Sequence, residues 1–392
     1  MTTNTEKFDR WIRNDFVEMN TALESRYFAQ TDDRVNVAGI GDDIKSALVT
    51  EGRDHIVRLL QEGNTDEGFE AGFDLLGNVG FYMAACRRHD ITEPSRETTS
   101  PLREASALAL QLGASLGVAP RFVTAHLSTH NRAVGGISKS FTRLDDEKIF
   151  NEYNTRSILG FKRAADALFR ILPVGVTSPL AADLLTAAKA ALDDVFANNA
   201  ILNERLDVDR FFLCVRPYFK PYRVGLHVYR GANAGDFAGI NVIDLLLGLC
   251  RADEAYYSQL LVDKLLYMLP EDQLLLKDCM RRGSFLQQLL ALPKRQQAGE
   301  PYRHCARLFL DVCEMHGRIA AQHHDQLVKR FIEEPSRGIS DEHMDTLTAS
   351  GPPLPVLLRA LEKLRDLRMA VERDDVRTSH RQIAQLRATL DG

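Results

Sequence analysis

Hydrophobic side chains recur every three or four residues along most of this chain, with polar and charged residues between them. Near the amino terminus the pattern runs from Phe8 to Leu23. It returns over four later segments, 158–172, 185–196, 256–269 and 302–331. This spacing places apolar side chains along one face of a helix. The sequence therefore predicts an all-α protein.

Strand-like alternation is confined to one short segment, VGLHVY at 224–229. Three stretches interrupt the helical pattern. Residues 93–101 form a polar linker, and 217–239 carry enough proline and glycine to predict irregular backbone. Residues 349–355 predict a loop before a last long helix that begins near Pro355. The alternating charges of that helix are typical of a solvated face.

The length and composition indicate an ordinary soluble protein. A chain of 392 residues is long enough for one large domain with a smaller appendage. We expect a small N-terminal helical unit over about residues 1–65, followed by a large helical domain over 66–392. No internal repeat is visible.

Charge and hydropathy exclude several classes of partner. The formal net charge of -5 provides no general basic field for nucleic acid or for an anionic membrane. No apolar run reaches the roughly 18 residues that would suggest a membrane span, and the first residues lack the apolar core of a signal peptide. The six cysteines show no CxxC spacing, which favours buried free thiols in a reducing compartment. We therefore expect a cytoplasmic protein.

A glycine-rich stretch at 230–250, RGANAGDFAGINVIDLLLGLC, is neither a dinucleotide fingerprint nor a P-loop. Its small residues leave the backbone open to close approach by a flat ligand or by another helix. These positions are 231, 232, 234, 235, 238 and 239. Helix packing is the simpler of the two interpretations, and the sequence does not decide between them.

Asp244 lies among apolar residues of a predicted helix. A carboxylate in that position needs a partner if it is buried. An arginine or a metal-ligated histidine would supply one.

The helix predicted over 314–331 contains His316, His323 and His324. Neighbouring residues on a helix point about 100° apart, so only one of the adjacent pair can face a single metal. Apolar positions upstream place His323 on their face, whereas those downstream favour His324. Gly317 would permit a kink that lets the downstream register decide.

The segment 211–248 resembles a known family. A Phe-Phe pair precedes an arginine (Phe211, Phe212 and Arg216), a small-residue segment follows (Asn233-Ala234-Gly235), and Asp244 stands ten residues after the alanine, before Leu-Leu-Gly. This spacing is similar to that of monodechloroaminopyrrolnitrin synthase and its relatives, a branch of the indoleamine 2,3-dioxygenase superfamily of heme proteins. Weaker similarity extends over about residues 70–375.

The resemblance implies an indoleamine 2,3-dioxygenase-like helical fold that holds heme b through one histidine. In the family an apolar residue follows the ligand at the third position and, in the synthase branch, an arginine at the sixth. Leu327 and Arg330 stand in this relation to His324. His324 is therefore the expected iron ligand, and His323 is the alternative.

The resemblance also implies the surroundings of the heme and of the substrate. The expected cofactor-binding residues are His324, Asn233, Ala234, Gly235, Asp244 and Arg318, with Arg318 pairing with Asp244. The expected substrate-binding residues are Phe211, Phe212, Arg216, Ser350 and Gly351. Two departures bear on this site. Pro352 and Pro353 replace a glycine in the loop, and Lys220 and Asn233 replace small hydroxyl residues.

The implied function is oxidative chemistry at a heme iron on tryptophan or a related indole, with O2 or peroxide as oxidant. A heme-binding sensor or carrier without catalysis shares every one of these motifs. A helical interaction protein with no cofactor is the third alternative. The sequence indicates no oligomeric state.

Overall fold

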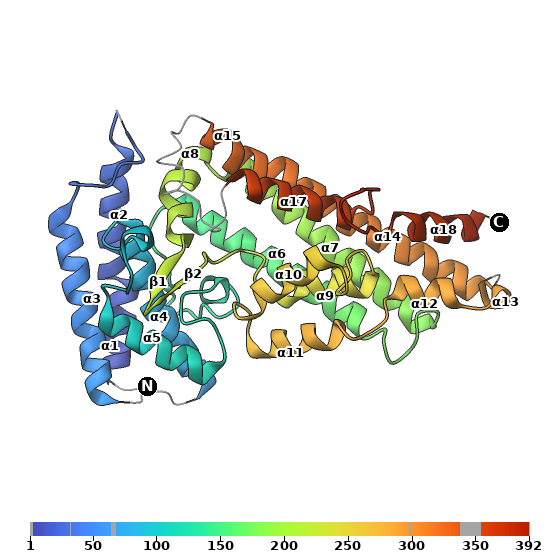
Figure 1. Ribbon diagram of the computed structural model, residues 1–392, viewed down its shortest axis with the longest axis horizontal. Coiled ribbons are helices and arrows are strands. Elements are labelled where there is room, and N and C mark those ends of the chain that lie inside the picture. The colour runs from blue at the N-terminus through green and yellow to red at the C-terminus, as the bar shows by residue number, and fades with distance from the viewer. Residues whose placement is uncertain (1–2, 32, 64–67, 298, 338–353, 392) are drawn as a thin grey trace. The chain divides into compact units, whose positions relative to one another are not determined.

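The computed structural model describes residues 3–31, 33–63, 68–297, 299–337 and 354–391. Helices make up nearly all of the regular structure in these residues, which confirms the all-α prediction (Figure 1). The strands within the described part of the chain are β1 (Tyr222–Val224) and β2 (His227–Tyr229).

The chain divides into two compact units, and each is discontinuous in sequence. Unit 1 comprises residues 1–152, 205–236 and 331–354, and unit 2 comprises 153–204, 237–330 and 355–392. This division differs from the expected one near residue 65, because the first three helices pack against the two that follow them. Residues distant in sequence complete both units, so periodicity along the chain could not reveal this organisation.

Unit 1 is built on five helices: α1 (Thr3–Arg13), α2 (Asp15–Phe28), α3 (Asp42–Glu62), α4 (Phe69–Arg88) and α5 (Arg103–Leu116). Figure 1 shows them side by side in blue and teal, and α4 contacts both α3 and α5. Most apolar positions between Phe8 and Leu23 are buried, as the pattern predicts, although Asn14 separates two helices there. Short helical segments complete the unit: η1 (Pro94–Arg96), η2 (Thr124–Leu127), α8 (Val208–Arg210), η3 (Phe211–Val215), η4 (Arg216–Phe219) and α15 (Glu334–Ser336).

Aromatic rings fill the core of unit 1. Phe141 lies 4.7 Å from Phe81 and 5.4 Å from Phe122, measured between ring centroids. Gly80 permits the approach of α4 to this cluster, because a Cβ there would lie 2.3 Å from the backbone nitrogen of Phe122. Burial of such rings is a large stabilising term.

The predicted strand at 224–229 is a hairpin. β1 and β2 pair antiparallel, with Tyr222 opposite Tyr229 and Val224 opposite His227. Gly225 turns the chain at a φ of 58°, which glycine adopts without a steric penalty. The alternating segment therefore does form β-structure, but Gly225 separates it into two short strands.

Unit 2 is formed by helices of 4 to 27 residues around one apolar core. They are α6 (Asp145–Phe169, which begins in unit 1), α7 (Pro179–Arg205), α9 (Ala238–Leu247), α10 (Ala255–Leu265), α11 (Pro270–Cys279), α12 (Phe285–Ala291), α13 (Lys294–Gln297), α14 (Glu300–Gln322), α17 (Leu354–Arg368) and α18 (His380–Asp391). α9 packs against α11, and α18 packs against α12 and α14. The predicted last long helix is therefore two helices, α17 and α18.

A change of helix type follows α14. Residues His323–Glu333 continue the same helix as a π-helix. Such segments have a wider turn than an α-helix and are frequent at functional sites. The histidine pair stands at the start of this segment.

All six cysteines are buried and free, as predicted. None of the described helices combines the length and apolar character needed to cross a membrane.

Candidate functional site

Asp244 is the centre of a buried polar network in unit 2. Its side chain is fully buried, and His316 Nε2 donates to Oδ1 at 2.7 Å. The Tyr257 hydroxyl donates to Oδ2 at 2.7 Å. Arg368 forms a two-armed ion pair with the same carboxylate, with Nε and Nη2 each 2.9 Å from an oxygen. The expectation that a buried Asp244 needs an arginine or histidine partner is met by both.

These contacts decide the charges in the network. Burial by itself would raise the pKa of Asp244, but Arg368 and the hydrogen bond from His316 outweigh it and hold that pKa below its ordinary value. Burial lowers the pKa of His316, and Asp244 only partly offsets this effect. A neutral His316 has its proton on Nε2, because a carboxylate only accepts. Its Nδ1 is buried and has no hydrogen-bond partner within the described residues.

The expected pairing of Asp244 with Arg318 is not the one in the structure. Arg318 is exposed, and its guanidinium lies 5.0 Å from the ring centroid of Phe196. Arg318 follows His316 by two residues, so the two side chains point to nearly opposite sides of α14. His316 faces Asp244, and Arg318 therefore cannot.

The alternating charges of the last predicted helix were interpreted as a solvated face. This interpretation is wrong for Arg368. Its side chain is only 12% exposed. Gly317 explains how α17 comes so close, because a Cβ on Gly317 would lie 3.1 Å from the carbonyl oxygen of Arg368. The glycine that suggested a kink instead permits close packing of α17 against α14, which remains α-helical through this point.

The two adjacent histidines differ in exposure. His323 has the more accessible side chain, although burial and the charge of Arg368 lower its pKa to about 4, whereas His324 is buried. Val328, four residues after His324, is also buried, so the π-helix presents this face to the protein. The apolar spacing downstream of the pair thus agrees with a buried His324, the histidine expected from the sequence to be the iron ligand. The identity of an iron ligand stays a prediction.

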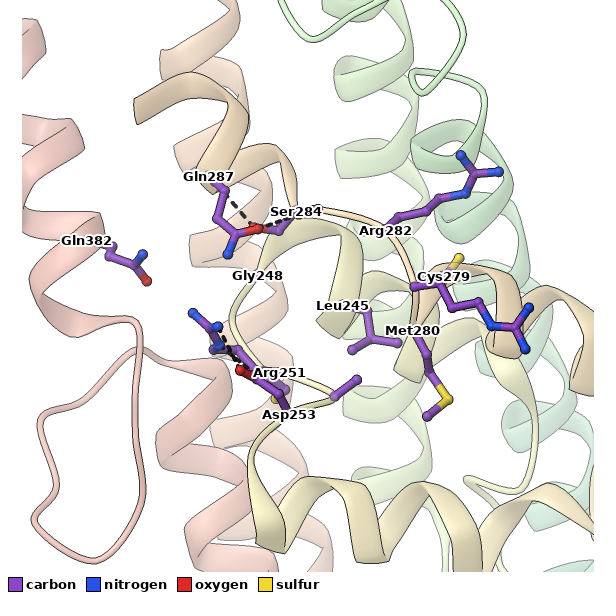
Figure 2. A pocket seen from close by; sticks show the side chains of 14 residues that line it. Leu245, Gly248, Arg251, Asp253, Cys279, Met280, Arg282, Ser284, Gln287 and Gln382 are labelled. Carbon is purple, nitrogen blue, oxygen red and sulfur yellow. Dashed lines mark hydrogen bonds and ion pairs between the residues drawn. The ribbon is translucent and has the colours of Figure 1, made fainter. Parts of the chain in front are cut away.

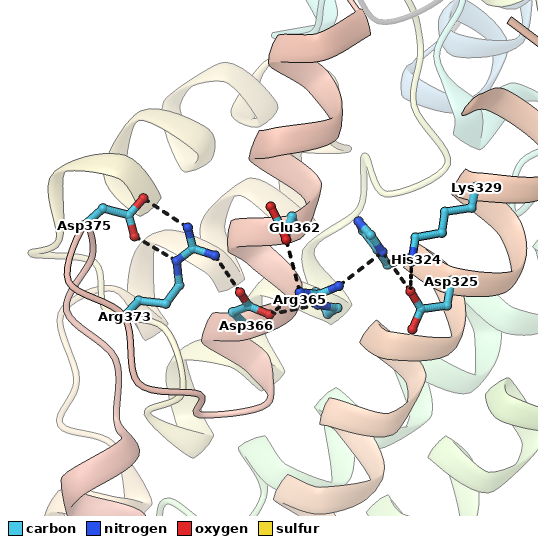
Figure 3. Close-up of polar contacts among 8 residues, drawn as sticks. All are labelled: His324, Asp325, Lys329, Glu362, Arg365, Asp366, Arg373 and Asp375. Atoms are coloured by element: carbon cyan, nitrogen blue, oxygen red, sulfur yellow. Dashed lines mark hydrogen bonds and ion pairs between the residues drawn. The ribbon is translucent and has the colours of Figure 1, made fainter. Parts of the chain in front are cut away.

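One nitrogen of His324 contacts two opposite charges. Nδ1 lies 3.1 Å from Asp325 Oδ1 and 3.4 Å from Arg365 Nη1 (Figure 3). Asp325 also accepts from Lys329 Nζ at 2.7 Å, and this hydrogen bond is the main reason that the pKa of Asp325 is lowered. Nε2 of His324 makes no hydrogen bond within the part of the chain that the structure describes.

Arg365 belongs to a longer series of ion pairs on α17 and the segment after it. Asp366 lies 2.7 Å from Arg365 and 2.5 Å from Arg373, and Arg373 lies 2.8 Å from Asp375 (Figure 3). Neither Asp325 nor Arg365 was identified from the sequence. The adjacency of Asp325 to the histidine was the available signal, whereas Arg365 is 41 residues away.

In unit 1, the structure brings Phe212 and Arg216 together. The Arg216 guanidinium lies 5.3 Å from the Phe212 ring centroid, and both side chains are buried. Burial lowers the pKa of Arg216 to about 10. Phe211 is half-buried and lies 5.0 Å from Phe150. These residues span a π-turn, η3, and a 3₁₀-turn, η4, so irregular helix also carries this group.

The small-residue segment forms a loop that an ion pair closes. Arg230 binds Asp236 through two contacts of 2.8 and 3.0 Å, and the backbone nitrogen of Asn233 donates to Asp236 at 2.8 Å. Asn233, Ala234 and Gly235 are half-buried in this loop. In unit 2, Gly239 packs against Phe161, where a Cβ would lie 3.2 Å from that backbone. At Gly239, therefore, helix packing accounts for the small residue.

Lys220, one of the departures from the family pattern, is buried in unit 1. Burial, together with the charges of Arg87 and Arg88, holds its pKa well below the ordinary value. Ser350 and Gly351, the expected loop contacts to substrate, lie outside the described residues, as do Pro352 and Pro353.

A polar cavity of about 240 Å³ lies near Gly248 in unit 2. Its lining comes from the end of α9, the connection between α11 and α12, and α18 (Figure 2). Arg251 and Asp253 pair at its edge at 2.9 Å, and Ser284 and Gln287 form the capping box of α12. Its volume is below the roughly 300–1,000 Å³ of pockets for drug-sized ligands. None of the residues expected to bind cofactor or substrate lines it.

A family model agrees with this chain over nearly its full length. The model described as monodechloroaminopyrrolnitrin synthase PrnB matches residues 2–390. The similarity seen in the sequence over about residues 70–375 therefore extends through the N-terminal helices as well.

Proposed function

The chain belongs to the monodechloroaminopyrrolnitrin synthase family, a family of heme-dependent oxidative enzymes that modify tryptophan, and we propose that it binds heme b through His324 and oxidises tryptophan or a related indole. The bound heme would supply the redox chemistry with O2 or peroxide. The residues of the chain would hold the iron, orient the substrate and limit the access of water.

The chemistry of His324 supports its role as the ligand. A ligating histidine donates its second ring N–H to a carboxylate or carbonyl, which fixes the tautomer and leaves the other nitrogen for the metal. Asp325 is such an acceptor for Nδ1, and Nε2 has no hydrogen-bond partner among the described residues. His324 therefore fits a heme iron, and this is the observation that carries the proposal.

The Asp244 network fits a supporting role in unit 2, the unit that also contains His324. Arg368 neutralises Asp244, and the two hold His316 and Tyr257 in fixed positions. Because Arg368 and not Arg318 contacts Asp244, we assign to Arg368 the electrostatic role that the resemblance implied for Arg318.

Arg216 and Phe212 support binding of an aromatic amino acid. A guanidinium pairs well with a carboxylate, and the adjacent ring offers an apolar surface for an indole. Because burial lowers the pKa of Arg216, an incoming carboxylate would offset part of the desolvation of this cation.

An absorption spectrum of the protein, as purified and after reconstitution with hemin, tests the proposal. We expect a Soret band, and we expect His324→Ala to weaken heme binding or change the spectrum, while the neighbouring variant His323→Ala keeps both. Loss of the band only in His323→Ala would transfer the ligand to His323. A protein that takes up no heme would overturn the proposal.

Turnover separates the enzyme from a heme-binding sensor or carrier. The loaded protein is incubated with tryptophan, tryptamine or indole and an oxidant, and the products are followed by mass spectrometry. We expect oxidation of tryptophan and a requirement for Arg216 that is stronger for tryptophan than for tryptamine, which lacks the carboxylate. Heme binding without turnover of any indole would favour the sensor or carrier.

A further inference from the structure

Two groups compete for a hydrogen bond with His324 Nδ1, because this nitrogen lies between the carboxylate of Asp325 and the guanidinium of Arg365. A neutral imidazole has one N–H and one lone pair. Nδ1 therefore either donates to Asp325 or accepts from Arg365. The first tautomer leaves the lone pair of Nε2 free for a metal, and the second places a proton there.

Distances favour the tautomer that donates to Asp325. The separation of 3.1 Å to Asp325 Oδ1 is within the normal range for an N–H···O hydrogen bond, whereas 3.4 Å to Arg365 Nη1 is beyond it. Arg365 also makes shorter contacts elsewhere, to Asp366 at 2.7 Å. Its donors are thus directed mainly to carboxylates and only weakly to the imidazole.

Both neighbours of the imidazole are themselves partly neutralised. Lys329 Nζ lies 2.7 Å from the same oxygen of Asp325 that faces His324. Arg365 is flanked by Asp366 and, at 3.5 Å, by Glu362 (Figure 3). The imidazole is therefore held between two moderated charges of opposite sign.

We propose that Asp325 and Arg365 are opposed positioning residues that set how strongly His324 donates electron density to a bound heme iron. Asp325 accepts the Nδ1 proton and increases the donor strength of Nε2. Arg365 contacts the same nitrogen and lowers the donor strength of Nε2. Lys329 reduces the negative charge that Asp325 presents to the imidazole. This inference rests on the proposed function, in which His324 is the ligand.

The arrangement predicts the sign of each substitution. Asp325→Asn keeps the shape but removes the charge, so the iron–histidine bond should weaken and the ferric/ferrous midpoint potential should rise. Arg365→Gln removes the opposing charge, so the bond should strengthen and the potential should fall. Lys329→Met should also strengthen the bond and lower the potential. Its effect should be smaller than that of Arg365→Gln, because the side chain of Lys329 is more exposed than that of Arg365 (45% against 21%).

A matched control distinguishes hydrogen bonding from a general effect of charge. Asp375→Asn removes a carboxylate from the same ion-pair series with the same exposure as Asp325, 49%. Asp375 contacts Arg373 and Lys363 and neither Arg365 nor His324. A change specific to the imidazole should therefore appear in Asp325→Asn and not in Asp375→Asn.

Resonance Raman spectroscopy of the ferrous, heme-loaded protein measures the iron–histidine stretching frequency, and spectroelectrochemistry measures the potential. We expect the frequency to fall in Asp325→Asn, to rise in Arg365→Gln and to stay unchanged in Asp375→Asn. Equal shifts in Asp325→Asn and Asp375→Asn, or shifts of one sign in Asp325→Asn and Arg365→Gln, would overturn the inference.

A measurement without heme separates failure of the inference from failure of the proposed function. The ¹⁵N chemical shifts of the His324 ring report its tautomer in the heme-free protein. We expect a proton on Nδ1 in the unsubstituted chain and a shift toward the Nε2 tautomer in Asp325→Asn. A proton on Nε2 in the unsubstituted chain would overturn the inference even where heme binds to His324. Absence of heme uptake with the expected tautomer would overturn the proposed function and with it the role toward iron.

Discussion

Two buried arginines, Arg368 in unit 2 and Arg216 in unit 1, differ in what surrounds their charge. Asp244 pairs with Arg368 through two short contacts, and this pairing outweighs the burial and raises the pKa of Arg368 above its ordinary value. Burial dominates at Arg216 and lowers its pKa to about 10. The Phe212 ring is one of the groups that contact Arg216.

The difference shows which effect dominates the pKa of each cation. Asp244 compensates the charge of Arg368, so the main contribution of Arg368 is to hold the Asp244 network together. Burial dominates at Arg216, and an incoming carboxylate would offset part of the desolvation of this cation. We therefore interpret Arg368 as a structural and electrostatic group and Arg216 as a substrate-binding group.

The largest effect should come from breaking the compensated pair. Asp244→Ala leaves Arg368 buried without its carboxylate, and we expect a loss of about 3–5 kcal/mol in the free energy of unfolding. Chemical denaturation followed by circular dichroism measures it. Asp253→Ala, which removes an exposed partner of Arg251, should change stability by less than about 1 kcal/mol. Equal losses in the two variants would contradict the special role of Asp244.

A smaller effect on stability, and a clear one on binding, should follow from Arg216→Met. Methionine keeps much of the length and apolar surface of the arginine and removes only its charge. We expect tryptophan to bind about 10–100-fold more weakly, the value of a charged hydrogen bond, and tryptamine to be little affected. Spectral titration of the heme-loaded protein measures both ligands. An equal loss for both would exclude recognition of the carboxylate.

The pH dependence of stability should distinguish Asp244 as well. Because its pKa is lowered in the folded protein, the unfolded chain takes up this proton first as the pH falls. The stability contributed by Asp244 is therefore complete above about pH 4 and is lost as the pH falls through the folded pKa. Unfolding free energies of the natural protein and of Asp244→Asn, measured between pH 7 and pH 3, should show a shallower decline below pH 4 in the variant. A parallel decline would refute the assignment.

His316 should contribute to the same curve at higher pH. Burial lowers its pKa, so the unfolded chain binds its proton at about pH 6.5 while the folded protein does not. Stability should therefore begin to fall as the pH drops below about 6.5. His316→Gln should flatten this part of the curve, and an unchanged slope would show that other groups cause it.

The smallest effect should belong to Arg318→Ala. Arg318 is exposed against Phe196 and makes no contact with Asp244, so we expect a change within about 0.5 kcal/mol. Arg368→Ala should be far more destabilising in the same denaturation experiment. A larger loss in Arg318→Ala would restore the pairing that the family resemblance suggested.

Much of the fold could be predicted because helical periodicity is a local property. Most of the apolar positions of α1, α2, α6, α7 and α14 that recur at helical spacing are buried. The hairpin was only partly predicted, since the turn depends on the positive φ of Gly225. The division into two discontinuous units was not predictable, because it depends on contacts between segments far apart in the chain.

The candidate site shows the same limit. The need of Asp244 for a partner could be derived from its apolar surroundings, but its arginine lies 124 residues downstream. The apolar spacing alone left His323 and His324 open, and the preference for His324 came from the family resemblance through Leu327 and Arg330. The π-helix that begins at His323 places His324 inside. Gly317 was interpreted as a possible kink, whereas it permits the close approach of α17.

By itself, the sequence determined that the protein is helical, that its cysteines are buried, and that a carboxylate in α9 must find a counterpart. Periodicity and the energetic penalty for an uncompensated buried charge are enough for these conclusions. The tertiary structure alone decided that Arg368 is that counterpart and that Asp325 and Arg365 share one nitrogen of His324. These pairings depend on the packing of α17 against α14, and no local pattern in the chain specifies which distant residues that packing brings together.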